Sequence, residues 1–257
     1  MSKAIFWHRR DLRIEDNAGL FKACQTAANV QPIFIFDTEI LNELERNDAR
    51  VEFIHNALQE LAKAYAKFGI FLRVEMGNPM DVIPTLAKEL GVDHVFTNRD
   101  YEPYALQRDK TIFEKLTELD IEFIGAKDHV IFEKHEVMKG DGTPYTVFTP
   151  YSRKWKERLS QEPIVSYDTT GALGNVQGID TAPKIPSLAA LGFENSGLDF
   201  PTNHVVDLLI QKYSDQRNFP AKPGTSKLGV HLRFGTISIR KIALQALPLN
   251  ETFLNEL

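Results

Sequence analysis

Two patterns of apolar residues alternate along the first 130 residues of the chain: short continuous runs and helical spacing. Short apolar runs predict five strands, at residues 4–7, 32–36, 71–74, 94–97 and 122–124. The second run is apolar throughout, as expected of a strand covered on both faces. Between the strands, apolar residues recur every three or four positions, which predicts helices at residues 18–28, 48–68, 79–90 and 102–119.

Residues that commonly begin or end helices support these boundaries. Asp48 and the Asn78-Pro79 pair suit helix starts, whereas Gly69 and Gly91 suit helix ends. Repeated β–α units with short links predict a parallel sheet covered by helices on both faces. We therefore expect an α/β fold, a Rossmann-like doubly wound parallel five-stranded sheet.

A ligand of such a sheet binds outside the carboxyl ends of its strands. In this chain those ends are Trp7-His8-Arg9, Phe36-Asp37, Glu75-Met76-Gly77 and Asn98-Arg99-Asp100.

The regular alternation of apolar patterns is lost after residue 128. Residues 139–144 read as a tight turn, residues 151–159 as a short basic helix, and the Gly-, Pro-, Ser- and Thr-rich residues 171–201 as a long surface connection without structure. A helical unit is predicted from residue 202. The expected parts are residues 1–130, an interdomain connection at 131–201, and the start of an all-α domain at 202–257.

Composition is that of an ordinary globular protein, with 43% hydrophobic and 25% charged residues among 257. No run approaches the ~18 apolar residues of a membrane span, and the first residues lack a secretion signal. Cys24 is the single cysteine, which excludes disulfides and cysteine-ligated metals. We expect a cytoplasmic monomer without a metal site, in which Cys24 is a small core residue.

The net charge of −5 argues against a broad nucleic-acid-binding surface. Charge is unevenly spread, because residues 201–257 carry seven Lys or Arg against four Asp or Glu. A solvated helical face explains this basic excess as well as a DNA-facing surface does.

The segment from Gly224 to Ser238 contains the most suggestive chemistry. Thr225 and Ser226 place two hydroxyls and free backbone N–H groups at the start of a short apolar helix, an arrangement that suits a phosphate. Taken alone, a Thr-Ser pair is more often a helix cap.

Three colinear segments together resemble the DNA photolyase and cryptochrome family. Residues 6–17 (FWHRRDLRIEDN) resemble its strand-then-RxDLRxxDN opening, with His8 where an aromatic is more usual. Residues 145–155 (YTVFTPYSRKW) resemble its VFTPF/Y…W segment. Residues 213–240, with YSDQRNFP, TSKLG and LRFG, resemble its flavin-binding signature.

For the first two segments the residues themselves favour structural roles. Asp16 and Asn17 can cap the following helix, and the neighbouring arginines can pair with carboxylates to stiffen the turn. Trp155 is expected to pack against the second domain.

The resemblance implies FAD as cofactor. Its phosphates and ribityl chain would be bound by Tyr213 and by the loop residues Thr225, Ser226, Lys227, Leu228 and Gly229. Gly229 stands where the family more often has serine, so one hydroxyl is missing while the backbone N–H remains.

The implied activity is blue-light-dependent repair of cyclobutane pyrimidine dimers in DNA by electron transfer from reduced FAD. Arg217 would meet a DNA phosphate and Glu256 the lesion, and no catalytic residue is assigned within this chain. The alternative is a cryptochrome, with the same fold and flavin but light signalling in place of repair.

Two further expectations concern the limits of the chain and its second chromophore. Residues 253–257 (FLNEL) resemble the start of the family's NELxWR segment, so we expect half a protein that binds FAD weakly or not at all and is itself inactive. Tyr104-Ala105 stands where folate-using members carry Asn-Glu, which argues against a folate antenna. A deazaflavin, a second flavin or no antenna remains open.

Overall fold

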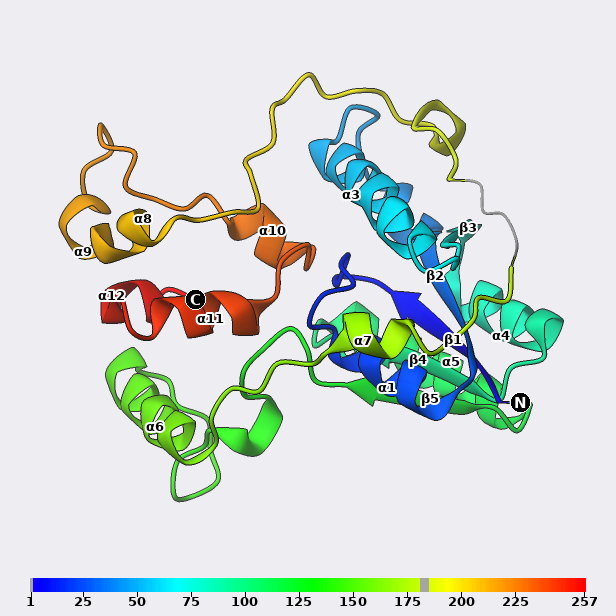
Figure 1. The fold of residues 1–257 in the computed structure, drawn as a ribbon, viewed down its shortest axis with the longest axis horizontal. Coiled ribbons are helices and arrows are strands. Elements are labelled where there is room, and N and C mark those ends of the chain that lie inside the picture. The colour runs from blue at the N-terminus through cyan, green and yellow to red at the C-terminus, as the bar shows by residue number, and fades with distance from the viewer. Residues whose placement is uncertain (1, 181–184) are drawn as a thin grey trace.

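The computed structural model describes residues 2–180 and 185–257. Five parallel strands form one sheet in the order β3-β2-β1-β4-β5 (Figure 1). Their bounds are β1 Lys3–His8, β2 Asn29–Asp37, β3 Arg73–Gly77, β4 His94–Asn98 and β5 Glu122–Ala126. The predicted doubly wound α/β sheet is confirmed, with the third strand two residues later than its apolar run suggested.

Alternation along the strands divides the core between the two faces of the sheet. Ala4 and Phe6 of β1 pack on the side of α1 (Ala18–Thr26) and α3 (Ala49–Ala66). Ile5 and Trp7 pack on the side of α4 (Pro79–Leu90) and α5 (Pro103–Thr117). Successive strand residues point to opposite faces, so an apolar run is buried on both.

The predicted caps of α3 and α4 are present. Asp48 and Asn78 each accept a hydrogen bond from a backbone N–H of the first turn. Gly91 ends α4 at φ +60°, a left-handed conformation that glycine adopts without a Cβ clash. All strand pairs are parallel, so the carboxyl ends of the strands lie together at one edge of the sheet.

Residues 131–201 differ in part from the prediction. They contain α6 (Phe148–Gln161), which confirms the helix predicted at residues 151–159, and also η1 (Lys134–Glu136), α7 (Thr169–Leu173) and η2 (Ala189–Leu191). Val176, Leu191 and Phe193 are buried in the core beneath α1 and α3, so a structureless surface connection is wrong for these parts. Residues 181–184 of that expectation lie outside the described residues. Scattered apolar residues in a Gly- and Pro-rich stretch carry no period that would have revealed this packing.

The C-terminal helices form a separate small core. They are α8 (Asp207–Gln211), α9 (Tyr213–Gln216), α10 (Gly229–Arg233), α11 (Ile239–Ala246) and α12 (Glu251–Leu254). Trp155 of α6 packs against this core, as predicted, and Figure 1 shows α6 beside α11 and α12.

A buried charge network joins these helices to the α/β domain. The Arg240 guanidinium donates to the carboxylates of Asp16 and Asp128, at 3.0 and 2.8 Å. Arg13 donates to both oxygens of Asp128, and Ser238 to Asp16. Asn17 caps α1 as expected, whereas Asp16 instead ties α1 to α11. Buried ion pairs with complete hydrogen bonding are costly to break, so this network fixes the orientation of α11.

Two simpler expectations can be checked directly. Within the described residues, the structure contains no helix with the length and apolar character needed to cross a membrane. Cys24, a residue of α1, is buried in the core, as predicted.

Candidate functional site

The loop after β1 docks onto the turn after α10 by backbone contact. The Leu12 amide donates to the Phe234 carbonyl at 3.1 Å. Gly235 adopts φ +62°, and a Cβ there would lie 2.1 Å from the Arg10 carbonyl oxygen. Only glycine satisfies both the conformation and the approach. The RxDLR and LRFG segments therefore meet in space, although more than 200 residues separate them in the chain.

Polar contacts hold the β1 loop rigid, as the sequence predicted. Arg9 donates to both oxygens of Asp109, at 2.6 and 2.8 Å. The Asp11 carboxylate accepts from the Arg9 amide at 2.7 Å and from Asn98 at 2.5 Å. Burial raises the pKa of Asp11, but the adjacent His8 ring, His129 and the Arg9 amide outweigh burial and leave the pKa well below its usual range.

A cavity of about 520 Å³ lies at the carboxyl edge of the sheet, between the strand ends and α10. We call it the strand-edge cavity. Because strand order changes direction between β1 and β4, this is the topological switch point at which open α/β sheets bind ligands. Its volume lies within the ~300–1,000 Å³ of small-molecule sites. Apolar side chains from β2, α2 (Thr38–Leu41), the segment after α2, and α3 form most of one wall: Phe34, Phe36, Ile40, Leu44, Val51 and Ile54.

The floor of the strand-edge cavity is aromatic and cationic. The Trp7 ring, 2% exposed, has the guanidinium carbons of Arg9 and Arg108 each 4.8 Å from its centroid. At the edge, the Tyr104 hydroxyl donates to Asp37 at 2.6 Å. Burial and this bond raise the pKa of Tyr104, so the phenol keeps its proton. The floor and edge thus offer a planar face beside fixed polar groups.

The rim nearest α10 is built from ion pairs. Arg10 donates to Asp100 at 3.2 Å and to Glu102 at 3.0 Å, and Arg233 of α10 donates to the same Glu102 at 2.6 Å. Burial raises the pKa of Asp100, but the nearby Arg10 and Arg9 outweigh burial and leave the pKa of Asp100 below its usual value. The carboxylate is therefore charged at neutral pH.

The sequence-predicted flavin loop leads directly into α10. Gly224 is buried against Gln216 of α9, where a Cβ would lie 2.6 Å from the Gln216 Cβ. Lys227 adopts φ +54°, a left-handed conformation that is uncommon for lysine. Thr225 is exposed, and the Ser226 hydroxyl accepts from the Leu228 amide at 3.4 Å. Gly229, at the end of the loop, lines the strand-edge cavity.

The other predicted residues form a cluster on α9, α12 and the residues that directly follow these two helices. The Tyr213 ring meets Phe253 edge-on at 5.0 Å between centroids, and the Arg217 guanidinium lies 5.4 Å from the Tyr213 centroid. Arg217 also pairs with Glu256. The structure thus brings Tyr213, Arg217 and Glu256 together in one cluster. The loop residues Thr225 to Gly229 come after Gly224 in the chain and are not part of this cluster.

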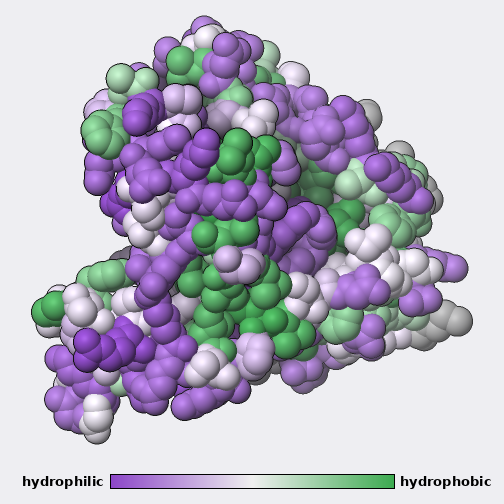
Figure 2. Space-filling model, turned by 60° about the vertical axis from the view of Figure 1, so that its left-hand side comes forward, coloured by the Kyte–Doolittle hydropathy of each residue, from purple (hydrophilic) through white to green (hydrophobic). Residues whose placement is uncertain are grey.

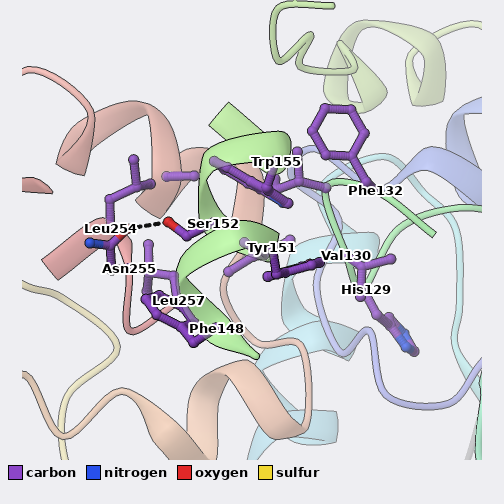
Figure 3. Close-up of a pocket in the computed structure, with 13 residues that line it drawn as sticks. His129, Val130, Phe132, Phe148, Tyr151, Ser152, Trp155, Leu254, Asn255 and Leu257 are labelled. Carbon is purple, nitrogen blue, oxygen red and sulfur yellow. Dashed lines mark hydrogen bonds between the residues drawn. The ribbon is translucent and has the colours of Figure 1, made fainter. Parts of the chain in front are cut away.

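A second cavity, of about 180 Å³, separates α6 from α11 and the C-terminal residues (Figure 3). Ser152 of α6 donates to Asn255 at 3.3 Å, so the VFTP segment meets the final NEL residues there. Phe148, 56% exposed, and Leu257, 38% exposed, also line this cavity. Figure 2 shows an apolar area bordered by polar residues on the face turned forward.

Sequence reasoning did not predict that α10 contributes both to the flavin loop and to the strand-edge cavity. Gly229, Val230, Arg233 and Phe234 line the strand-edge cavity, although the sequence placed their segment in the flavin-binding signature alone. The arginine of LRFG offered little signal, because its side chain is half exposed at the end of α10 and can be solvated without a partner. Its partner, Glu102, lies 131 residues away and could not be paired from sequence.

Comparison with known proteins agrees with this geometry. A family model described as DNA photolyase matches residues 4–167. A deoxyribodipyrimidine photo-lyase of Synechococcus sp. PCC 6301 is 34% identical over 252 residues, covering 92% of this chain and 52% of that protein. The chain thus spans about half the length of the photo-lyases that it matches.

Two solved structures share the fold. A class III photolyase from Agrobacterium tumefaciens superposes with a TM-score of 0.80 at 23% identity, over 100% of this chain and 56% of the other. An archaeal photolyase from Sulfolobus tokodaii, described with two FAD molecules, has a TM-score of 0.72 at 25% identity, over 99% of this chain and 56% of the other.

Proposed function

Since this chain belongs to the DNA photolyase family, we propose that it serves in the blue-light-dependent repair of cyclobutane pyrimidine dimers in DNA. The observation that carries the proposal is the convergence of the matching segments: the RxDLR loop, the flavin loop and LRFG meet around α10. In this proposal residues 1–130 form the antenna domain, residues 131–201 connect the domains, and residues 202–257 begin the FAD domain.

FAD is the proposed cofactor, held by Tyr213 and the loop Thr225 to Gly229. The loop fits a phosphate group in one respect, because Thr225 is exposed and its hydroxyl is therefore accessible to a ligand. Gly224 fits as well, since its close approach to Gln216 turns the chain sharply before the loop. When bound and reduced, FAD supplies the light-excited electron donor. The residues of this chain would bind its phosphates and orient it.

The strand-edge cavity is the proposed antenna site, with a flavin or deazaflavin as occupant. Its apolar walls and the Trp7 floor suit a planar ring system, and the Asp37–Tyr104 pair offers polar groups to a ring edge. The Sulfolobus tokodaii photolyase is described with two FAD molecules and a novel light-harvesting cofactor. Tyr104 and Ala105 do not supply the amide and carboxylate expected for a folate.

Damaged DNA is the proposed partner, approached through Arg217 and Glu256. Both side chains are accessible, at 29% and 47% exposure, and each is charged. A DNA phosphate would replace the Glu256 carboxylate as the partner of Arg217 and free Glu256 for the lesion. The dimer must leave the duplex to be reached, which costs less for a damaged pair.

The test uses the polypeptide as its source organism makes it, loaded with reduced FAD and given a dimer-containing oligonucleotide. We expect loss of the dimer under blue light and none in the dark. Photoreducible bound flavin without repair would instead indicate a cryptochrome-like role.

A matched pair of variants tests the assignment of the loop. Thr225→Val should weaken FAD binding by about 10- to 150-fold, the value of one hydrogen bond to a charged group, ~1.5–3 kcal/mol. Thr85→Val, on the exposed face of α4, should leave FAD binding unchanged. Equal FAD affinities in the two variants would contradict the loop assignment.

A further inference from the structure

Helix α10 is a wall shared by two proposed sites. Its first residue, Gly229, ends the flavin loop, while Val230 and Arg233 line the strand-edge cavity together with Phe234. The helix has only five residues. A helix this short has almost no stability of its own, so its order comes from what it packs against. Contacts in the strand-edge cavity therefore bear directly on the conformation of the loop.

Ion pairs and a hydrogen bond attach α10 to the rim of the strand-edge cavity. Glu102 accepts from Arg233 at 2.6 Å and from Arg10 at 3.0 Å. The Arg10 Nε also donates to the Arg233 carbonyl at 3.2 Å. Arg10 and Glu102 belong to the α/β domain at the switch point, whereas Arg233 belongs to the flavin-binding segment. These three residues link the two parts at the edge of the cavity.

The preceding loop has the features of a segment that gains from added order. Lys227 has a left-handed backbone, and Thr225, Lys227 and Gly229 are exposed. Ordering such a segment costs conformational entropy, ~1–2 kcal/mol per residue. A ligand of the loop must meet that cost when it binds, unless another contact has already met it.

We propose that occupancy of the strand-edge cavity strengthens FAD binding by the flavin loop, through α10, with Glu102 and Arg233 as positioning residues. The inference rests on the proposed function, because it takes both sites as chromophore sites. A ring in the cavity packs on Val230 and Phe234 and holds α10 in place. FAD then binds a loop that is already ordered, and by linkage FAD strengthens binding in the cavity by the same factor.

The expected size is at the lower end of measured couplings, about 5-fold in affinity. Glu102 is 53% exposed, and exposed ion pairs contribute modestly. Removing its charge should therefore reduce the coupling to within about 2-fold of none, without unfolding the protein.

The experiment uses probes that lack a phosphate, so that they cannot occupy the loop in place of FAD. Riboflavin and 8-hydroxy-5-deazariboflavin are each titrated by absorbance, and amide hydrogen exchange of residues 225–235 is compared with and without saturating probe. FAD affinity is then measured in both conditions. Glu102→Gln is the test variant, and Glu114→Gln on the outer face of the same helix is its matched control.

Support would be slower exchange in residues 225–235 and about 5-fold tighter FAD binding when a probe is bound. Both effects should persist in Glu114→Gln and largely vanish in Glu102→Gln at saturating probe. A merely structural role for Glu102 would change exchange equally with and without probe, which would overturn the assignment. Saturable probe binding with unchanged exchange would overturn the coupling itself. Titrations that never saturate would overturn the antenna site, and the coupling with it.

Discussion

Gly235 offers the sharpest test of how the two halves of the chain are joined. Its φ of +62° places it in the left-handed region, and its Cα faces the backbone of Arg10 and Asp11. In Gly235→Ala the added Cβ would meet the Arg10 carbonyl oxygen at 2.1 Å and the Asp11 Cα at 2.6 Å. Both neighbours are backbone atoms, so no side chain can rotate away.

The magnitude follows from two contributions. A left-handed backbone costs a non-glycine residue about 1–2 kcal/mol. The clash must also separate the segments, which breaks the hydrogen bond from Leu12 to Phe234, worth ~1 kcal/mol, and loosens that from Arg13 to the Gly235 carbonyl. Gly235→Ala should therefore lower the free energy of unfolding by about 3 kcal/mol. Gly192→Ala isolates the first contribution, because Gly192 has φ +85° but open space around its Cα.

The assay is urea unfolding of the two variants beside the wild type, followed by tryptophan fluorescence, with hydrogen exchange at the Leu12 amide as a local probe. We expect Gly192→Ala to lose about 1–2 kcal/mol with Leu12 still protected, and Gly235→Ala to lose more and expose Leu12. Equal losses in the two glycine variants, with Leu12 protected in both, would refute the docking argument.

Three other predictions concern buried groups. Asp16→Asn leaves buried Arg240 with one fewer counter-charge and should cost about 3 kcal/mol in urea unfolding, against ~0.5 kcal/mol or less for Glu15→Gln beside it, whose partner is exposed. Cys24 has a pKa raised to about 12 by burial, so Ellman's reagent at pH 8 should modify it only after unfolding; rapid reaction in the native protein would show the core packing to be wrong. Burial raises the pKa of Asp128, but its two arginine partners lower it further and leave the folded value below 3.8. The stabilisation by the Asp128 carboxylate is therefore fully present above that pH and is lost as pH falls toward the folded value. Urea midpoints measured from about pH 6 to about pH 2 should fall more steeply in the wild type than in Asp128→Asn, in which the other carboxylates of lowered pKa, among them Asp11 and Asp100, still contribute a loss.

The sequence was sufficient where local rules dominate. Strand and helix positions followed from apolar periodicity, and Asp48, Asn78 and Gly91 marked helix ends because caps depend on neighbouring residues only. The arginines after β1 were expected to find carboxylates, and they do. The position of the strand-edge cavity at the carboxyl ends of the strands also followed from the sequence, because an open parallel sheet binds its ligands there.

The sequence was insufficient where distant segments meet. Nothing local indicates that Val176 and Phe193 enter the α/β core, because irregular segments carry no periodicity. The pairing of Glu102 with Arg233 depends on the docking of Gly235 against the β1 loop. The same docking gives α10 its place in the strand-edge cavity, which the spacing of the flavin loop does not reveal.

The most direct measurement of the central claim is an action spectrum of dimer repair, made with the polypeptide as its source organism makes it and with both chromophores bound. The proposal predicts repair that requires light and follows the summed absorption of reduced FAD and the cavity chromophore. Loss of the cavity chromophore should remove its band from the spectrum and leave the FAD band. Bound chromophores that drive no repair at any wavelength would contradict the account.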